Sequence, residues 1–135
     1  MYFEKTTFTN NTGNDIFSIA TSITIIDSNF SGAGKKAKDS SFIYAEQTQV
    51  YIDGTTMSDS HGPGNRGIRC KSCKSLTLGN NTFYRLYSTP YSSPGYEGAA
   101  INIYDSNGIC FDAENFFSNL EADKGPAIYV YNSAV

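Results

Sequence analysis

The chain has 135 residues and a formal net charge of −3, and 39% of its residues are hydrophobic and 14% aromatic. This length suits a single domain with a modest core. The acidic balance argues against a general nucleic-acid-binding protein. The sequence contains no apolar run long enough for membrane insertion.

Apolar residues recur in the same order along the chain, which indicates a repeat. The first anchors, Ile16, Phe42 and Ile68, are evenly spaced, and each is followed at the same distance by Ile26, Ile52 or Leu78. Two later copies begin at Ile101 and Ile128, after longer and unequal gaps. A constant core spacing with loops of variable length is typical of a solenoid.

Each repeat contains short segments with apolar residues at alternate positions, the pattern of a strand with one buried face. In chain order, strands are expected at 16–18, 24–26, 42–44, 50–52, 68–70, 76–78, 101–103, 109–111 and 128–130. Their β-branched and aromatic residues favour strand over helix. Apolar residues that close each turn are expected at Phe30, Met57, Phe83 and Phe116.

We therefore predict an all-β fold, a parallel β-helix or β-solenoid of about five coils, with residues 1–135 forming a single segment. The opening residues match the middle of a coil, because Met1 and Phe3 align with Ile109 and Phe111. Neither end carries a capping unit, although open solenoid ends expose strand edges and core. We expect a longer solenoid or an assembly of copies stacked end to end.

Two short motifs recur in the outer coils. Phe8–Asn11 and Phe116–Asn119 read Phe-x-x-Asn, and Gly98–Ile101 and Gly125–Ile128 approximate Gly-Gly-Ala followed by an aliphatic residue. They resemble the right-handed parallel β-helix of the pectin-lyase-like superfamily, and in particular the repeats of polymorphic outer membrane proteins and of large protist or bacterial surface proteins. The middle coils depart from this pattern. The resemblance implies an extracellular or cell-surface structural or adhesive role, without catalytic residues.

The cysteines offer one candidate disulfide. Cys70 falls in an inward column, which favours a buried thiol that acts as a small hydrophobe. Cys73 completes a C-x-x-C, but His61 is the single histidine of the chain and no second ligand pair is present for zinc. A bridge between Cys73 and Cys110 in neighbouring coils is the candidate pairing.

Three Asn-x-Ser/Thr sequons, at Asn10, Asn29 and Asn80, fall at or near expected corners. They are candidate N-glycosylation sites. The alternative is turn chemistry, because asparagine accepts positive φ and bonds its local backbone. Inward-pointing Asn29 and Asn115 would form a ladder between coils.

The longest expected loop, between Phe83 and Ile101, is rich in tyrosine. Its candidate ligand-contact or lateral-contact residues are Tyr84, Arg85, Tyr87, Tyr91 and Tyr96. Aromatic faces stack on sugar rings and on apolar surfaces, and loops on a rigid scaffold often carry recognition. Glycans are therefore candidate partners. The alternative is that these tyrosines pack the loop against its own solenoid. The basic residues Arg66, Arg69, Lys71 and Lys74 are expected to be solvated.

Stacked carboxylates raise the question of catalysis. Asp27, Asp53 and Asp112 share a predicted column, but Gly79 interrupts it and each aspartate precedes a turn. We predict no catalytic, cofactor or metal site, and a non-enzymatic structural or adhesive segment. The alternatives are a subunit of an extracellular filament stacked end to end, and a carbohydrate-active enzyme, either a polysaccharide lyase or a glycoside hydrolase.

Overall fold

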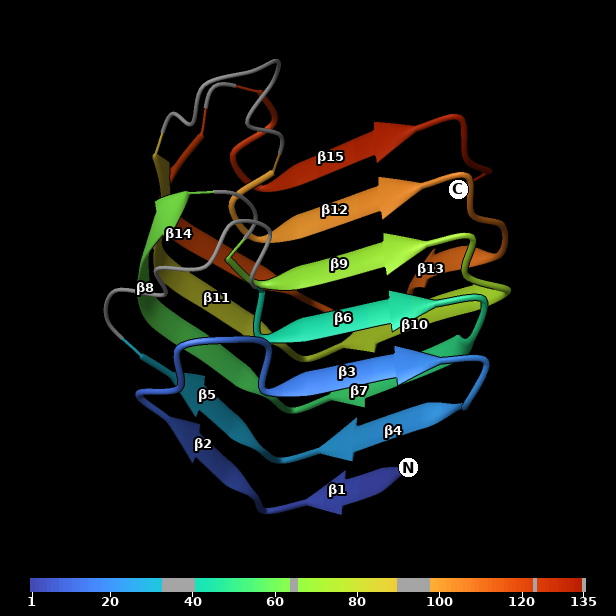
Figure 1. The fold of residues 1–135 in the computed structure, drawn as a ribbon, viewed down its shortest axis with the longest axis horizontal. Helices are drawn as coiled ribbons and strands as arrows, with labels where there is room; N and C mark the ends of the chain where they lie inside the picture. Colours follow the sequence, from blue (N-terminus) through green and yellow to red (C-terminus); the bar gives the residue numbers. More distant parts are fainter. Residues whose placement is uncertain (33–40, 64–65, 90–97, 123, 135) are drawn as a thin grey trace.

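The computed structural model describes residues 1–32, 41–63, 66–89, 98–122 and 124–134. Within these ranges the chain forms fifteen β-strands and no helix, and the strands make three parallel sheets of five (Figure 1). Each coil contributes one strand to each sheet. These features confirm the all-β parallel solenoid of about five coils that the repeat predicts.

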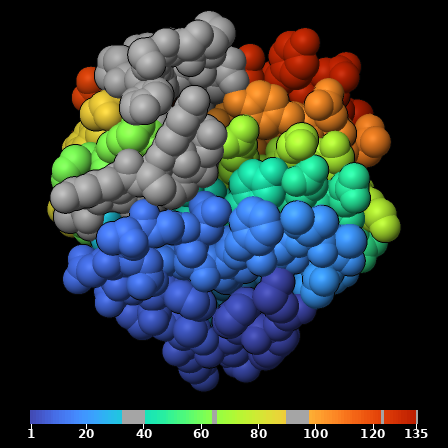
Figure 2. Space-filling model, in the orientation of Figure 1, coloured from blue at the N-terminus to red at the C-terminus, as the bar shows by residue number. Residues whose placement is uncertain are grey.

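Each sheet takes one strand from every coil. On the face drawn in Figure 2, successive coils form bands from the N-terminal (blue) to the C-terminal (red) end. The first sheet contains β1 (Tyr2–Glu4), β4 (Ile23–Ile26), β7 (Gln49–Asp53), β10 (Ser75–Gly79) and β13 (Ile109–Phe111). The second contains β2 (Thr7–Thr9), β5 (Asn29–Ser31), β8 (Thr56–Pro63), β11 (Thr82–Thr89) and β14 (Phe116–Glu121). The third contains β3 (Ile16–Ile19), β6 (Ile43–Glu46), β9 (Ile68–Lys71), β12 (Ile101–Tyr104) and β15 (Ile128–Tyr131).

The stacking register of the second coil, which contains β4 and β6, differs by one residue from the predicted one. The observed pairs are Ile16 with Ile43 and Ile25 with Ile52, so Phe42 and Ile26 lie one position away from the columns assigned to them. A slip of one residue turns the apolar set of a strand to the opposite face. The register therefore follows the buried faces rather than a constant spacing along the sequence.

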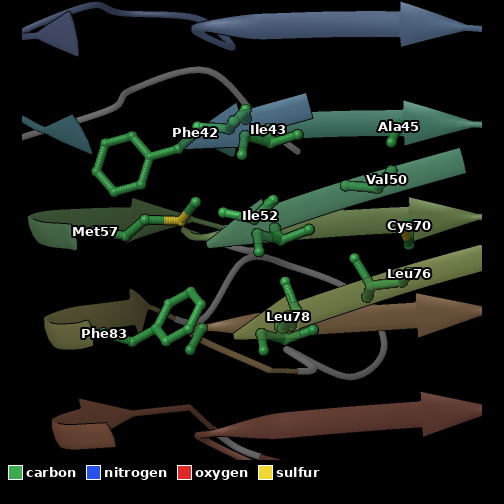
Figure 3. Packing of buried hydrophobic residues seen from close by; sticks show 14 of the residues in the cluster. Phe42, Ile43, Ala45, Val50, Ile52, Met57, Cys70, Leu76, Leu78 and Phe83 are labelled. Atoms are coloured by element: carbon green, nitrogen blue, oxygen red, sulfur yellow. The ribbon is translucent and has the colours of Figure 1, made fainter. Parts of the chain in front are cut away.

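The core consists of columns of similar side chains, one from each coil (Figure 3). A stacked column on the second sheet contains Phe8, Phe30, Met57, Phe83 and Phe117. The ring centroids of Phe8 and Phe30 are 4.6 Å apart, and those of Phe83 and Phe117 are 5.0 Å apart. Phe116, which we predicted for this column, is 61% exposed because its neighbour Phe117 takes the inward position.

The corner between the first and second sheets is built alike in successive coils. It begins with a residue of positive φ, between 47° and 59°, at Lys5, Asp27, Gly54 and Asn80. The next residue of each corner belongs to a ladder between coils. The backbone N–H groups of Thr6, Ser28, Thr55 and Asn81 donate to the side-chain oxygens of Ser28, Thr55, Asn81 and Asn115, respectively. The ladder satisfies polar groups that the corner would otherwise bury without partners.

The structure corrects the predicted asparagine ladder. Asn29 lies in β5, and its side chain is on the outer face because the adjacent Phe30 points into the core. Asn81 takes the expected inward place: its Nδ2 donates to Oδ1 of Asn115 at 3.0 Å and to the carbonyl oxygen of Ile52 at 2.9 Å.

Candidate functional site

Three of the predicted contact residues lie on a strand rather than in a loop. Tyr84, Arg85 and Tyr87 belong to β11, which pairs with β8 on one side and β14 on the other. The loop prediction is wrong for these residues, because a long strand replaces the short apolar segment expected there. Tyr91 and Tyr96 lie outside the described residues.

A positive-φ residue at the same place in three neighbouring strands of the second sheet explains how β11 presents two outward residues in succession. Asp59, Arg85 and Asn119 have φ angles of 57°, 52° and 51° in consecutive coils. The ladder pairs Tyr84 with Ser58 and Leu86 with Ser60, and it skips the residue between them. Positive φ resets the alternation, so Tyr84 and Arg85 both avoid the core while Leu86 is fully buried.

Two contacts hold Arg85 in a fixed position at this bend of β11. Its Nε lies 2.5 Å from Oδ1 of Asp59 and its Nη2 lies 2.9 Å from Oδ2, a bidentate pair. The guanidinium carbon is 4.5 Å from the centroid of the Tyr84 ring. The hydrogen bond with Arg85 lowers the pKa of Asp59 below its usual range, and the hydrogen bond with Asp59 raises the pKa of Arg85.

Beside this ion pair is a shallow hollow of about 170 Å³, lined by Asp59, Ser60, His61, Arg85 and Tyr87. Small-molecule pockets are usually ~300 Å³ or more and enclose most of their ligand. The hollow therefore suits a single side chain or sugar substituent better than a whole small-molecule substrate.

The outward residues of the third sheet form a second candidate surface, which we call the third-sheet face. It has two rows in register from β3 to β15. One row is Phe17, Tyr44, Arg69, the buried Asn102 and Tyr129, and the other is Ile19, Glu46, Lys71, Tyr104 and Tyr131. Phe17, Ile19 and Tyr131 are more than half exposed. The strands that carry this face lie toward the viewer in Figure 1.

Side chains of the third-sheet face support one another along the axis. The rings of Phe17 and Tyr44 stack at 5.0 Å. The guanidinium of Arg69 lies 5.8 Å from the Tyr44 ring centroid and 5.7 Å from that of Tyr104. The sequence analysis missed these contacts between aromatic and cationic side chains, although the residues alternate with the buried residues of the same strands.

Glu46 neutralises part of the charge on this face. Its Oε2 accepts a hydrogen bond from the Tyr44 hydroxyl at 2.8 Å, and its Oε1 lies 3.1 Å from Nζ of Lys71. The Tyr44 hydrogen bond, followed by that from Lys71, lowers the pKa of Glu46. The face therefore combines apolar rings with an ordered ion pair.

One predicted solvated residue is buried. Arg66 has no exposed surface, and its guanidinium donates to the carbonyl oxygen of Pro63. The expectation fails there because Arg66 enters the corner before β9 instead of its outer face. Arg69 also differs from the expectation, since it packs between tyrosine rings.

The aspartates do not form the expected stack. Asp53 pairs with Ile26 and Gly79, whereas Asp27 lies one residue further on, at the position of Gly54. Oδ1 of Asp53 accepts a hydrogen bond from Nδ2 of Asn80 at 2.9 Å. Among the described residues, no group of three His, Cys, Asp or Glu side chains is arranged to hold a metal ion.

The three sequons occupy different environments. Asn10 and Asn80 are exposed and have φ angles of 55° and 54°, as turn asparagines do. Asn29 is half-buried within β5 rather than at a corner.

The structure does not bring Cys73 and Cys110 together. Sγ of Cys73 lies 2.6 Å from Sγ of Cys70, and both side chains are buried. Cys110 is exposed on β13, in register with Thr77 on the outer face of the first sheet. The predicted pairing fails because the corner turns Cys73 into the core.

Comparisons with known proteins identify no relative: no family model, no curated protein and no solved structure matches the chain. The described residues contain no helix long and apolar enough to cross a membrane. What is established is the architecture, a parallel β-solenoid of stacked repeats.

Proposed function

We propose that this chain is a non-enzymatic structural or adhesive β-solenoid segment of a cell-surface or extracellular protein, related in architecture to the pectin-lyase-like superfamily and to polymorphic outer membrane protein repeats. The third-sheet face carries this proposal. Along one row the ring of Phe17 stacks on that of Tyr44, and Arg69 packs against Tyr44. Asn102 follows Arg69 in this row, and the Arg69 guanidinium also reaches the ring of Tyr104 in the adjacent row. A flat aromatic surface on a rigid scaffold suits lateral contact with extended partners, and sugar rings stack on such surfaces.

The test is binding to an array of neutral and acidic polysaccharides. The variant Phe17→Ser/Tyr131→Ser removes two rings that are 59% and 57% exposed on the third-sheet face. The control Tyr2→Ser/Phe116→Ser removes two rings that are each 61% exposed on the other two sheets. We expect the first variant to lose at least about tenfold in apparent affinity, equivalent to about 1.4 kcal/mol, and the control to bind as the wild type does.

Equal losses in both variants, or no binding to any polysaccharide, would contradict an adhesive face for glycans. The same incubations measure release of reducing ends or of unsaturated sugars. Turnover would favour the alternative of a polysaccharide lyase or hydrolase. The carboxylates of Asp27 and Asp53 are not in register, so they give this alternative little support.

A second candidate function is end-to-end stacking into a filament, and the exposed apolar columns of the outer coils favour it. Phe3 and Phe8 in the first coil are only partly buried, as are Phe117, Leu120 and Ile128 in the last two turns of chain. The partner would be a further coil of the same chain or another copy, because only a coil continues all three sheets. Sedimentation velocity at increasing concentration tests this, and Phe8→Glu should abolish any concentration-dependent growth.

A further inference from the structure

Two thiols meet inside the third coil, and neither the fold nor the candidate surfaces require them. The Sγ atoms of Cys70 and Cys73 are 2.6 Å apart, and the side chains are 0% and 1% exposed. Cys70 points inward from β9 among the core residues of Figure 3. Ser72, with a φ of 52°, turns the corner and directs Cys73 back toward Cys70.

We propose that Cys70 and Cys73 form a disulfide within the coil when the chain folds in the presence of a low-molecular-weight disulfide such as oxidised glutathione. The two sulfur atoms already lie within about 0.6 Å of bonding distance. The third cysteine does not compete, because Cys110 is exposed on the outside of β13. The bond would join the end of β9, in the third sheet, to the corner that leads into β10, in the first sheet.

The environment of the pair distinguishes the two sulfurs. A hydrogen bond with the Cys70 thiol lowers the pKa of Cys73, while the contact with Cys73 and burial raise the pKa of Cys70. These differences belong to the closed coil, so before closure the thiolate of either cysteine attacks a sulfur of the small disulfide and releases one small thiolate. The other cysteine then loses its proton and attacks the sulfur of the first, which releases the second small thiol.

The exchange needs no group of the protein other than the two cysteines, because the small disulfide is the oxidant. One disulfide bond of the small molecule is broken and one protein disulfide is formed. The two protons leave the cysteines and are carried by the two small thiols. Since both sulfurs are buried in the folded coil, we expect the exchange to occur before the third coil closes.

The neighbouring coils supply a redox-inert replacement for each cysteine. Ala45 occupies the column of Cys70 in the preceding coil. Ser106 occupies the corner position of Cys73 in the following coil, where its Oγ accepts the Cys73 backbone N–H at 2.9 Å. Cys70→Ala/Cys73→Ser therefore keeps side chains that these positions already accept, and it serves as the matched control.

The experiment refolds the denatured protein in a glutathione redox buffer and then alkylates it under denaturing conditions. We expect an intact mass lower by two hydrogen atoms and one alkylated thiol, that of Cys110, instead of three. Trypsin cleaves after Lys71, between the two cysteines, so the digest should contain two short peptides joined through Cys70 and Cys73. Three alkylated thiols, or a linkage of Cys73 to Cys110, would overturn the proposal.

A stability measurement separates the bond from the mere presence of two thiols. Reductant should lower the denaturant midpoint of the refolded wild type and of Cys110→Ser, since a disulfide restricts the unfolded chain. It should leave the midpoint of Cys70→Ala/Cys73→Ser unchanged. A wild-type midpoint that does not respond to reductant would overturn the proposal, as would an equal response in the double variant.

Discussion

Two connections of the same solenoid follow opposite rules. The corner from the first to the second sheet keeps the same short length in each of the first four coils and is longer only in the last. The connection from the second to the third sheet changes from coil to coil, and it is short between Pro63 and Ile68 but long between Thr89 and Ile101. The short corner carries the positive-φ residue and the side-chain ladder in successive coils. The comparison teaches that one edge of the molecule fixes the register while another accepts variation in length.

The largest effect should come from placing the same insertion at these two connections. Gly-Ser inserted between Asp53 and Gly54 displaces the ladder residue Thr55, and we expect the cooperative unfolding transition to be lost. Gly-Ser inserted between Thr12 and Gly13 extends a loop with open space around Gly13, and should cost less than about 1 kcal/mol. Urea unfolding followed by circular dichroism measures both. Similar destabilisation by the two insertions would refute the comparison.

A smaller effect should follow from removing one ladder side chain. Asn81→Ala leaves the Thr55 N–H and the Ile52 carbonyl oxygen without their buried partner. We expect a loss of about 2–3 kcal/mol in the free energy of unfolding. Asn11→Ala, in the variable connection, removes an exposed hydrogen bond to Asp15 and should change it by less than about 0.5 kcal/mol. If Asn81→Ala also lowered the free energy of unfolding by less than about 0.5 kcal/mol, the ladder would contribute little to stability.

Backbone conformation provides a finer distinction between the two edges. Gly54 has a φ of 59°, and an added Cβ would meet the Asp27 carboxylate, so Gly54→Ala should cost about 1–2 kcal/mol. Gly13→Ala meets no atom and should be neutral or stabilise by up to about 1 kcal/mol through the unfolded state. The denaturant midpoints of the two variants, compared where the slope of the unfolding free energy is unchanged, measure both effects. A neutral Gly54→Ala would show that this corner tolerates an ordinary side chain.

The smallest effect concerns the ion pair between Asp59 and Arg85 in the second sheet, on the strands that lead into the variable connection. The pKa of Asp59 is lowered in the folded protein, so its contribution to stability is complete above the unfolded pKa and disappears as the pH falls through the folded pKa. The effect should be slight because the side chains of Arg85 and Asp59 are 50% and 41% exposed. Carbon-13 NMR titration of the Asp59 carboxyl group measures it. An Asp59 pKa at its ordinary value in the wild type would contradict the ion pair. So would an Asp59 pKa that does not rise in Arg85→Gln.

The sequence was sufficient to predict the solenoid because stacked coils repeat the same buried columns. The longer gap before Ile101 also has a simple origin, since the connection before β12 is much longer than the one before β9. The predicted register is wrong at Ile26. A constant spacing along the sequence assigns Ile26 to the column of Ile52, whereas the adjacent Ile25 occupies it. Only the burial of Ile25 decides between the two isoleucines.

The contact surfaces were predicted less well, for two physical reasons. At Arg85 a positive φ interrupts the alternation, so a strand resembled the beginning of a loop. On the third-sheet face, Tyr44 and Arg69 come from different coils, and their proximity depends on a register that the repeat spacing alone predicts incorrectly. The C-x-x-C was visible in the sequence, but the corner at Ser72 that brings its sulfurs together was not.

The arrangement of the hydrogen bonds has a mechanical consequence. All the strand ladders connect one coil to the next, and the two ends of the described chain lie at opposite ends of the stack (Figure 1). Tension applied between these ends therefore pulls along the direction of the hydrogen bonds and loads one coil boundary at a time. The molecule should yield in a series of low-force steps, each releasing one turn of chain, while resisting a load spread across several coils of one face.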